Sequence, residues 1–518
     1  MEISPFLTPI RTKFEANKII GMNFFTNNTS IKLMLFVYTF LIFADCTYSQ
    51  KLKQPNILLI MLDDVSPEQF SCYGVDGWGN TPNVDKLASN GVMFKTCYAS
   101  AMCAPSRVEI MTGEYGVSTG VLQNGIWIGD SRDNVYKNHQ AFGKLLKDAG
   151  YATAIAGKWH AGNSKPYDEE VGFDEYCLWE GLKEIKDLPG SPKFKGQLED
   201  EKTTSRYWHP GIIKNHKLLE TKPNDYGPDI FADFIMDFME RKTKEGKPFL
   251  AYWPSVAPHG TRTGAPTTPH RGEVGDLGPA KNSEDGRLRF IALNEYIDFL
   301  MGKVMTKIKD LGIEKNTIVI FTSDNGTAVT AKTRGVERGS HVVNIISGGG
   351  IKQRGATDEL TDFSDIAPTL VDLAGAKLSK GKKFDGKSLV PFLFGETDAH
   401  REWIHGYIST SQLIRTKDYM LEVVNPLLGM PKGRFYYTGD NRNQRGYEFV
   451  NDNPKHAKER KKFDEILKNL PALTIDHPFW KTKKGKKFYK QYTKPKTVEK
   501  HLYNHKDYKF YDEGLKGK

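Results

Sequence analysis

Cysteine is scarce in this chain. Among 518 residues there are five cysteines, namely Cys46, Cys72, Cys97, Cys103 and Cys177. Small secreted domains that depend on disulfides for stability use cysteine far more densely. A disulfide-stabilised scaffold is therefore excluded. With 39% hydrophobic residues, the chain is long enough and apolar enough to build a large hydrophobic core instead.

Internal repeats of fixed period are also missing, and so are apolar runs long enough to cross a bilayer. The run from Leu33 to Phe43 falls short of the ~20 residues that a spanning helix needs. Lys32 precedes this run, and small and polar residues follow it up to Ser49. This order is typical of a secretory signal peptide, which we predict over residues 1–49. No transmembrane span is expected.

The start and the fate of this segment leave alternatives open. Met22 is a second candidate for the start, since residues 1–21 have no targeting pattern of their own. Anchoring as a lipoprotein would use Cys46, but Asp45 before it fits that processing poorly. We expect an exported, periplasmic protein, with secretion or attachment to the outer membrane as a lipoprotein as the alternatives.

The net charge of +10 is concentrated at one end of the chain. Residues 455–518 hold 19 Lys and Arg against 8 Asp and Glu, a net charge of +11, and the remainder is close to neutral at −1. A nucleic acid is one partner for such a tail. A signal peptide favours an extracellular polyanion instead, so we expect no nucleic-acid partner. A merely solvated, lysine-rich surface is the alternative.

Four short apolar runs each lead into a polar cluster. Asn56–Leu62 is followed by Asp63 and Asp64, Ala152–Ala156 by Gly157–His160, Phe249–Trp253 by Ala257–Gly260, and Thr317–Phe321 by Ser323–Gly326. Continuous apolar runs are typical of strands buried on both faces. Helical patterns lie between them, at Gln140–Ala149, Ile230–Met239 and Leu288–Leu311. This alternation predicts an α/β fold with a large, mostly parallel sheet sandwiched by helices.

In such sheets ligands bind beyond the carboxyl ends of the strands, so the four clusters can converge on one site. There Asp63, Asp64, Asp324 and Asn325 would supply three carboxylates and one amide oxygen. Hard oxygen ligands favour Ca²⁺ or Mg²⁺ over Zn²⁺, and a cation would relieve the repulsion between adjacent carboxylates. Any one cluster alone is more simply a helix cap or a turn.

Cys103 is followed by Ala-Pro-Ser and Arg107. Proline suits the first turn of a helix, so we expect a helix that begins here and continues through Thr112. Cys103 would then lie at a helix N-terminus, where free N–H groups and the helix dipole stabilise an anion. Arg107 lies one turn later and can point back to the same place. A buried structural cysteine is the alternative.

Together these segments resemble the type I, formylglycine-dependent sulfatases of the alkaline phosphatase superfamily. Cys103–Arg107 matches the family signature Cys-x-Pro-Ser-Arg. The other clusters match in the family's order: the aspartate pair, the cysteine motif, Gly-Lys-x-His, Pro-His, and Asp-Asn-Gly. The resemblance spans residues 54–375 and includes Asp365–Leu370 (DIAPTL). Any one of these motifs is weak by itself, whereas the five together are specific.

The resemblance implies both cofactors and roles. Cys103 would be converted to formylglycine by a formylglycine-generating or an anaerobic sulfatase-maturating enzyme, and Ca²⁺ would be held by that residue with the four oxygen ligands above. Arg107 would orient residue 103, Lys158 and Lys332 would grip the sulfate, His259 would be the acid for the leaving alcohol, and His160 would assist sulfate release. These side chains together would neutralise the sulfate ester and align its attacker.

One stretch departs from the family pattern. After Asp-Asn-Gly the family has a lysine, a short spacer and Glu-Gly-Gly, and here Arg338 replaces the first of those glycines. Lys332 takes the position of the family lysine, with Arg334 as a close competitor.

The resemblance also implies the domain plan, with a catalytic domain over residues 50–400 and a small antiparallel-sheet subdomain with the basic tail over 401–518. We expect the substrate to be a sulfated carbohydrate, a polysaccharide or its oligosaccharides, of an algal type such as ulvan or carrageenan. The insert 261–280 is expected to help select it. Four tryptophans would suit a sugar if exposed: Trp78, Trp127, Trp179 and Trp208.

Three other functions compete with this one. A dedicated sulfate scavenger that acts on small esters fits the basic tail less well than an enzyme for a sugar polymer does. A phosphodiester or phosphonate monoester hydrolase of the same superfamily can carry the cysteine signature, but the oxygen-only metal set and Lys158-Trp159-His160 favour sulfate. A non-catalytic protein that binds sulfated glycans is disfavoured because every expected catalytic side chain is present.

Overall fold

The computed structural model describes residues 54–74, 79–186, 194–259, 265–266, 281, 283–326, 332, 335–441, 447–470 and 476–493. The predicted signal peptide, Trp78, Arg334 and the insert 261–280, apart from 265 and 266, lie outside these residues. Within the described part of the chain, no helix combines the length and the apolar character that crossing a membrane requires.

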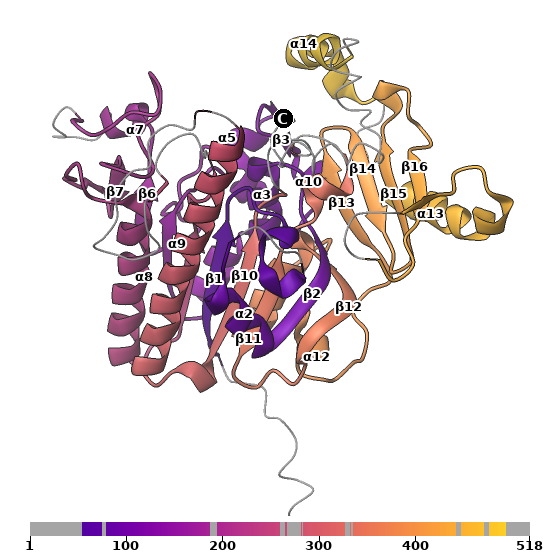
Figure 1. Ribbon diagram of the computed structural model, residues 1–518. Coiled ribbons are helices and arrows are strands. Elements are labelled where there is room, and N and C mark those ends of the chain that lie inside the picture. Colours follow the sequence, from indigo (N-terminus) through magenta and orange to yellow (C-terminus); the bar gives the residue numbers. More distant parts are fainter. Residues whose placement is uncertain are drawn as a thin grey trace, which may run out of the picture. The chain divides into compact units, whose positions relative to one another are not determined.

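A ten-stranded sheet forms the larger part of the structure (Figure 1). Its strands, in spatial order, are β12 (Gly355–Asp362), β2 (Gly91–Tyr98), β11 (Asn344–Gly348), β10 (Thr317–Ser323), β1 (Asn56–Leu62), β9 (Phe249–Pro254), β5 (Ala152–Gly157), β6 (Glu175–Trp179), β7 (Ile212–Lys214) and β8 (Lys217–Leu218). The five adjacent strands from β10 to β6 run parallel to one another. The mostly parallel sheet expected from the sequence is confirmed.

The four predicted strands are the adjacent strands β10, β1, β9 and β5 at the centre of this sheet. Their registers pair Leu59 of β1 with Ile320 of β10 and with Tyr252 of β9. Because all four are parallel, their carboxyl ends lie at one edge of the sheet. The four polar clusters therefore leave the sheet at the same edge.

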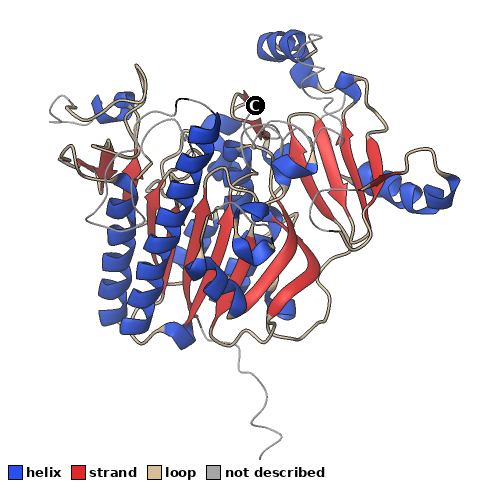
Figure 2. Ribbon diagram, in the orientation of Figure 1, coloured by secondary structure: helices blue, strands red, loops and turns tan. Residues whose placement is uncertain are grey.

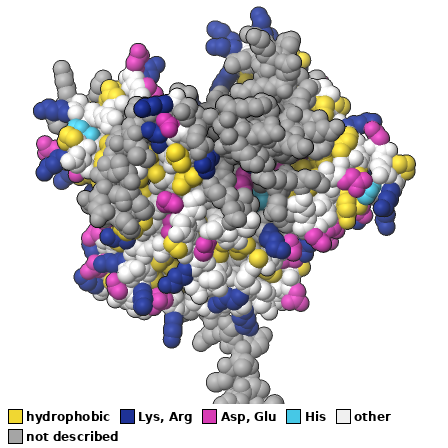
Figure 3. Space-filling view, viewed as in Figure 1, with side chains coloured by type: hydrophobic (Ala, Val, Ile, Leu, Met, Phe, Trp, Pro, Cys, Tyr) yellow, Lys and Arg dark blue, Asp and Glu magenta, His cyan; other side chains and the backbone are white. Residues whose placement is uncertain are grey.

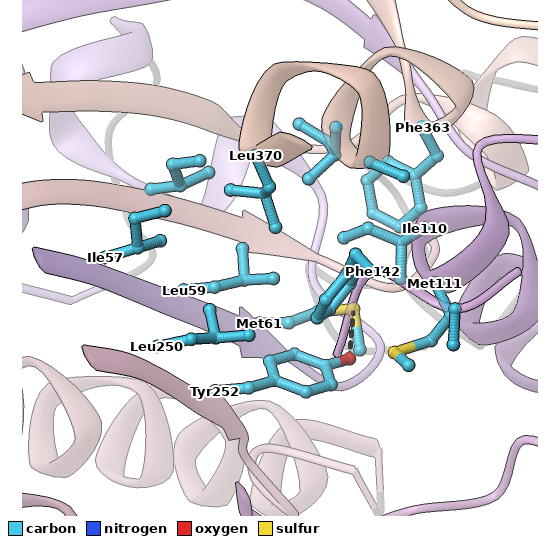
Figure 4. Packing of buried hydrophobic residues seen from close by; sticks show 14 of the residues in the cluster. Ile57, Leu59, Met61, Ile110, Met111, Phe142, Leu250, Tyr252, Phe363 and Leu370 are labelled. Atoms are coloured by element: carbon cyan, nitrogen blue, oxygen red, sulfur yellow. Dashed lines mark hydrogen bonds between the residues drawn. The ribbon is translucent and has the colours of Figure 1, made fainter. Parts of the chain in front are cut away.

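Helices cover both faces of the sheet (Figure 2). One face packs against α3 (Cys103–Thr112), α6 (Phe142–Asp148) and α11 (Ile366–Ala374), and the other against α2 (Pro82–Ser89), α8 (Gly227–Lys244) and α9 (Ser283–Asp310). Strand β1 serves both faces, since its side chains point alternately to either side. Ile57, Leu59 and Met61 join the first core, where Figure 4 shows them facing the helices. The helices predicted at 140–149, 230–239 and 288–311 are confirmed.

A second, five-stranded antiparallel sheet follows the larger one in the chain. It contains β13 (Ile404–Ile408), β14 (Ser411–Arg415), β15 (Tyr419–Val424), β16 (Arg434–Tyr437) and β17 (Glu448–Phe449). This is the smaller antiparallel sheet expected from the sequence. The remaining strands and α-helices of the described residues are the hairpin β3 (Val121–Gln123) and β4 (Ile126–Trp127), and the helices α4 (Gly116–Thr119), α5 (Ser131–Asn138), α7 (Leu182–Lys186), α10 (Glu337–Ser340), α12 (Val390–Leu393), α13 (Ala457–Asn469) and α14 (Lys483–Tyr492).

Candidate active site

The ends of three central strands are tied together by backbone hydrogen bonds beyond the regular ladder. The Asp63 N–H, just after β1, donates to the carbonyl of Ala257 after β9 at 3.1 Å. The Asp324 N–H, just after β10, donates to the carbonyl of Leu62 at 2.9 Å. These bonds bring Asp63 and Asp324 to the same point, although 261 positions separate them in sequence.

Asp64 and Asn325 complete this cluster. The Asp64 N–H donates to Asp324 Oδ1 at 3.1 Å, and Asn325 Nδ2 donates to Asp64 Oδ1 at 2.7 Å. Asp64 has a φ of 65°, in the left-handed region that L residues other than glycine rarely occupy. A strained backbone conformation of this kind persists only where the surrounding structure holds it in place. Strained residues are often found at functional sites.

Two buried oxygens of the cluster have no hydrogen-bond partner among the described residues. These are Asp63 Oδ1 and Asn325 Oδ1. Both can only accept, and leaving a buried acceptor unsatisfied costs about 1–3 kcal/mol. A divalent cation would satisfy them. Ligand atoms of Asp63, Cys103 and Asp324 lie within 4.8 Å of one another, so the donor set fits a hard cation.

Electrostatics favour a cation at the same point. Burial, and next the negative charge of Asp63, raise the pKa of Asp324 to about 6. Burial also acts to raise the pKa of Asp63, but the positive charge of Lys158 and of other neighbours holds it well below its usual value. Two carboxylates this close repel each other, and a cation between them would remove the repulsion.

Cys103 is the first residue of α3, as expected, and its side chain is buried. Two contacts hold the start of this helix. Asn124, in the β3–β4 turn, accepts from the Ala104 N–H at 3.1 Å, and the Ala101 N–H donates to the carbonyl of Tyr407 in β13 at 3.1 Å. Burial raises the pKa of the Cys103 thiol to about 11, so an unmodified thiol stays protonated near neutral pH and is a poor nucleophile.

Arg107, one turn along α3, connects this helix to the acidic cluster. Its Nη2 and Nε donate to Asp324 Oδ2 at 2.8 and 3.0 Å, and its Nη1 donates to the carbonyl of Lys158 at 2.7 Å. The side chain is fully buried. Arg107 therefore fixes α3, and Cys103 with it, against the ends of β10 and β5.

The two predicted sulfate-binding lysines both reach the cluster. Lys158 Nζ lies 2.5 Å from Asp63 Oδ2, and Lys332 Nζ donates to Asp64 Oδ1. The Lys158 N–H bonds to the carbonyl of Pro254 at 2.8 Å. Gly157 permits this approach, because a Cβ there would lie 1.9 Å from the Pro254 oxygen.

The two predicted histidines lie at the same place on different loops. His259 follows β9, and its Nε2 is 3.5 Å from Asp64 Oδ2. Burial lowers the pKa of His259 to about 4, so the ring is neutral near pH 7. His160 follows β5, has an exposed side chain and adopts a φ of 47°. It is the second site residue held in the left-handed region.

A cavity of about 440 Å³ opens over this cluster. Its wall includes five predicted site residues: Cys103, Lys158, His160, His259 and Lys332. All ten predicted site residues are thus brought together: Asp63, Asp64, Asp324 and Asn325 form the acidic cluster that Arg107 contacts, and the other five line the cavity.

Other residues of the cavity wall come from the end of β6 and from the irregular chain beyond it, namely Trp179, Glu180, Glu199 and Arg206. Trp179 is one of the four tryptophans that the sequence suggested for sugar binding, whereas the other three residues were missed from the sequence. The pattern around β6 was too short to recognise, although its parallel orientation places Trp179 at the same edge as the four clusters. The other three residues carry no spacing signal.

The expected exposure of the tryptophans is wrong for two of them. Trp127 and Trp208 are 4% and 8% exposed, because both pack among apolar side chains. Trp179 is half-buried in the cavity wall.

The departure at Arg338 is accommodated structurally. Its Nη2 donates to Glu68 at 3.1 Å, and the preceding Glu337 pairs with Arg415 of β14 at 2.7 Å. The glycine of Asp-Asn-Gly is required here, since a Cβ on Gly326 would lie 2.0 Å from the Arg338 carbonyl oxygen.

Comparisons with known proteins agree with this geometry. A family model described as "Sulfatase" matches residues 55–376. The N-acetylgalactosamine-6-sulfatase of Sus scrofa is 30% identical over 369 residues, which cover 65% of each chain. The human arylsulfatase A is 28% identical over 393 residues, covering 70% of this chain and 72% of the relative. The match thus spans less than two thirds of the length of the pig relative.

Solved structures share the fold at lower identity. Ps i-CgsB, crystallised in complex with k-i-k-neocarrahexaose, superposes with a TM-score of 0.64 at 20% identity, covering 86% of this chain and all of that one. The phosphonate monoester hydrolase of Agrobacterium radiobacter superposes with a TM-score of 0.53 at 19% identity, covering 80% and 94%.

Proposed function

This chain belongs to the sulfatase family, and we propose that it hydrolyses the sulfate esters of a sulfated carbohydrate. One observation carries the proposal. A buried cysteine at a helix start, Cys103, shares a cavity with Lys158, Lys332 and His259 directly above a carboxylate cluster. Such a site can neutralise the charge on a sulfate group and hold an attacking atom in line with sulfur.

Residue 103 would act as formylglycine, produced from Cys103 by a formylglycine-generating or an anaerobic sulfatase-maturating enzyme. Addition of water to its aldehyde would supply two hydroxyls, one that attacks sulfur as the alcohol leaves and one that loses its proton as sulfate is expelled and the aldehyde re-forms. The raised thiol pKa supports the conversion, since an unmodified Cys103 would be protonated and weakly nucleophilic.

The cation is proposed to be Ca²⁺, held by residue 103 and the four oxygen side chains Asp63, Asp64, Asp324 and Asn325. It would supply positive charge beside the sulfate and lower the pKa of the attacking hydroxyl. The two unpartnered buried oxygens and the repulsion between Asp63 and Asp324 support this assignment.

The remaining side chains would position the ester and manage protons. Lys158, directly after β5, and Lys332, in the chain after β10, both line the cavity and would grip the sulfate oxygens. Arg107 would keep residue 103 oriented through its pairing with Asp324. His259 would present a proton to the leaving oxygen, and His160 would assist the release of sulfate.

A carbohydrate substrate is supported by the rest of the cavity wall. Trp179 offers an apolar ring face, while Glu180 and Asn163 offer oxygen and amide groups suited to sugar hydroxyls. Relatives named for N-acetylgalactosamine-6-sulfate, and the structural neighbour bound to a carrageenan-type oligosaccharide, act on or bind such sugars. An algal polymer of the ulvan or carrageenan type is the proposed source.

The C-terminal segment supports a polymer rather than a small ester. Phe479 and Trp480 pack with Leu122 and Ile126 of the β3–β4 hairpin, whose turn residue Asn124 lines the cavity. Helix α14 therefore lies beside the hairpin whose turn lines the cavity, and Figure 3 shows its Lys side chains at the top of the view. We propose that this surface attracts a polyanionic chain. The signal-peptide pattern agrees with an exported enzyme, periplasmic in location.

The proposed function is tested by comparing turnover of an aryl sulfate with that of an aryl phosphate and a phosphonate monoester, using protein matured on residue 103. We expect sulfate release to dominate. Dominant hydrolysis of the phosphorus substrates would favour a phosphonate or phosphodiester hydrolase, and binding without turnover would favour a glycan-binding protein. A panel of sulfated polysaccharides and their oligosaccharides would then identify the sugar.

A further inference from the structure

Arg206 contacts Nδ1 of the His259 ring, whereas the other ring nitrogen, Nε2, faces the acidic cluster. Arg206 Nη1 lies 2.9 Å from His259 Nδ1, and Nε2 is the nitrogen near Asp64. A guanidinium carries donors and no acceptor, so Nδ1 must accept the hydrogen bond and carries no proton. The single proton of a neutral imidazole then sits on Nε2.

Arg206 is itself held firmly. Glu199 accepts from its Nε through Oε1 at 2.8 Å and from its Nη2 through Oε2 at 2.9 Å. The guanidinium carbon lies 4.2 Å from the centre of the Trp179 ring, and the side chain is only 8% exposed. A planar guanidinium clamped by a carboxylate and stacked on an indole has little freedom to rotate.

The neighbouring residue holds the backbone of the same histidine. The Tyr207 hydroxyl donates to the carbonyl of His259 at 2.7 Å, and Tyr207 is buried. Two consecutive residues therefore fix His259, one at its ring and one at its main chain. Neither belongs to the five motifs that define the family resemblance.

We propose that Arg206 is a positioning residue that sets the tautomer of His259, so that its Nε2–H points into the cavity toward the leaving oxygen. The proposal rests on the proposed function for the identity of that oxygen. Without Arg206, Nδ1 could hold the proton and Nε2 would become an acceptor, which cannot donate to the leaving group. Glu199 and Trp179 act one step further out, by holding Arg206 in place.

The tautomer can be measured directly by ¹⁵N NMR on protein labelled at histidine, with the His259→Gln variant used to assign the signal. We expect Nδ1 of His259 to show the shift of an unprotonated ring nitrogen and Nε2 to carry the proton. In Arg206→Met the proton should populate Nδ1. A proton on Nδ1 in the wild-type protein, or an unchanged tautomer in Arg206→Met, would overturn the proposal.

Kinetics provide the second readout. Arg206→Met should lower kcat/KM for an alkyl sulfate roughly 10–100-fold, the range typical when a residue that orients an active-site ligand is lost. Added guanidinium should restore part of this loss, and methylammonium should restore less. The matched control is Arg241→Met, which removes another guanidinium bidentate to a glutamate, Glu175, outside the cavity. That variant should keep wild-type kcat/KM.

Two outcomes distinguish a failure of the positioning role of Arg206 from a failure of the proposed function. An Arg206→Met loss equal for alkyl and aryl sulfates, insensitive to guanidinium, would assign Arg206 a merely structural role. The NMR experiment needs no turnover, so a protein that hydrolyses no sulfate yet shows the Nε2–H tautomer would refute the proposed function and leave the tautomer assignment standing.

Discussion

Arg107 and Asp324 form a buried ion pair in which two guanidinium nitrogens share one carboxylate oxygen, Nη2 at 2.8 Å and Nε at 3.0 Å from Oδ2. The other oxygen, Oδ1, accepts from the Asp64 N–H. Since Arg107 lies one helical turn after Cys103, this pair joins the start of α3 to the carboxylate cluster. The distance between residue 103 and the proposed metal ligands is thereby set by a contact that water does not screen.

Replacing Cys103 by serine should abolish sulfatase turnover, because a serine hydroxyl can form a sulfated ester but has no second hydroxyl through which to expel sulfate. The fold should be unaffected, since the side chains are similar in size. Aryl sulfate hydrolysis measures the first effect and thermal unfolding the second. A Cys103→Ser protein with full activity would refute the formylglycine mechanism. Protein made without a maturating enzyme should also be inactive.

Chelation should remove activity, and added Ca²⁺ should restore it. Binding should also stabilise the fold by about 2.7 kcal/mol at 100 times the dissociation constant, because the cation binds the folded state selectively. Thermal unfolding in Ca²⁺ and in Zn²⁺ would compare the two ions. Asp324→Asn should lose the stabilisation, whereas Asp358→Asn, at an exposed ion pair with Lys95, should keep it. Activity unchanged after exhaustive chelation would contradict the assignment.

His259→Ala should reduce hydrolysis of alkyl sulfates far more than that of activated aryl sulfates. A poor leaving group needs a proton donor, and such catalysis is typically worth ~10²–10⁴-fold. His259→Gln, which keeps an N–H donor, is the matched comparison and should retain more activity than His259→Ala. The check is kcat/KM for a series of leaving groups, and equal losses along that series would argue against this role.

Neutralising five exposed lysines in and beside α14 should weaken binding to a sulfated polymer at low salt. These are Lys481, Lys483, Lys484, Lys486 and Lys487. Attraction between exposed charges fades beyond a screening length of ~8 Å at physiological ionic strength, so the effect should shrink as salt rises. Turnover of a small sulfated sugar should barely change.

The control for this experiment neutralises five exposed lysines that lie outside the cavity wall, namely Lys86, Lys247, Lys309, Lys315 and Lys352. It should leave polymer affinity close to that of the wild type. If both sets have equal effects, or if affinity does not depend on salt, the lysines of α14 only solvate the surface.

Glu180→Gln should alter how the stability of the protein depends on pH. Burial raises the pKa of Glu180 to about 7 from a usual 4.5, so the folded state binds the proton more tightly than the unfolded state. That stabilisation is complete below pH 4.5 and is lost as pH rises through 7. As pH rises from below 4.5 to above 7, the free energy of unfolding of the wild type should therefore fall by on the order of 3 kcal/mol more than that of Glu180→Gln. Urea unfolding at pH 5 and pH 8 measures this, and parallel behaviour of the two proteins would rule it out.

Much of the fold was determined by local sequence. The strands β1, β5, β9 and β10 are continuous apolar runs, and α3, α6, α8 and α9 lie where the sequence predicts helices. Such runs can be recognised because burial on both faces of a sheet leaves no room for alternating polar residues. The polar residues directly after each strand could be placed at one edge of the sheet because the carboxyl ends of parallel strands lie together.

Tertiary structure alone decided what surrounds those residues. Arg206 and Glu199 come from irregular chain with no periodicity, and Trp127, in the two-residue strand β4, is buried. The hydrogen bond from Arg206 to His259 joins residues 53 positions apart. A contact of that kind depends on how the loops beyond β6 and β9 fold over the sheet edge, and no spacing rule encodes it. The motifs therefore determined the candidate site residues, and only packing determined which nitrogen of His259 faces the acidic cluster.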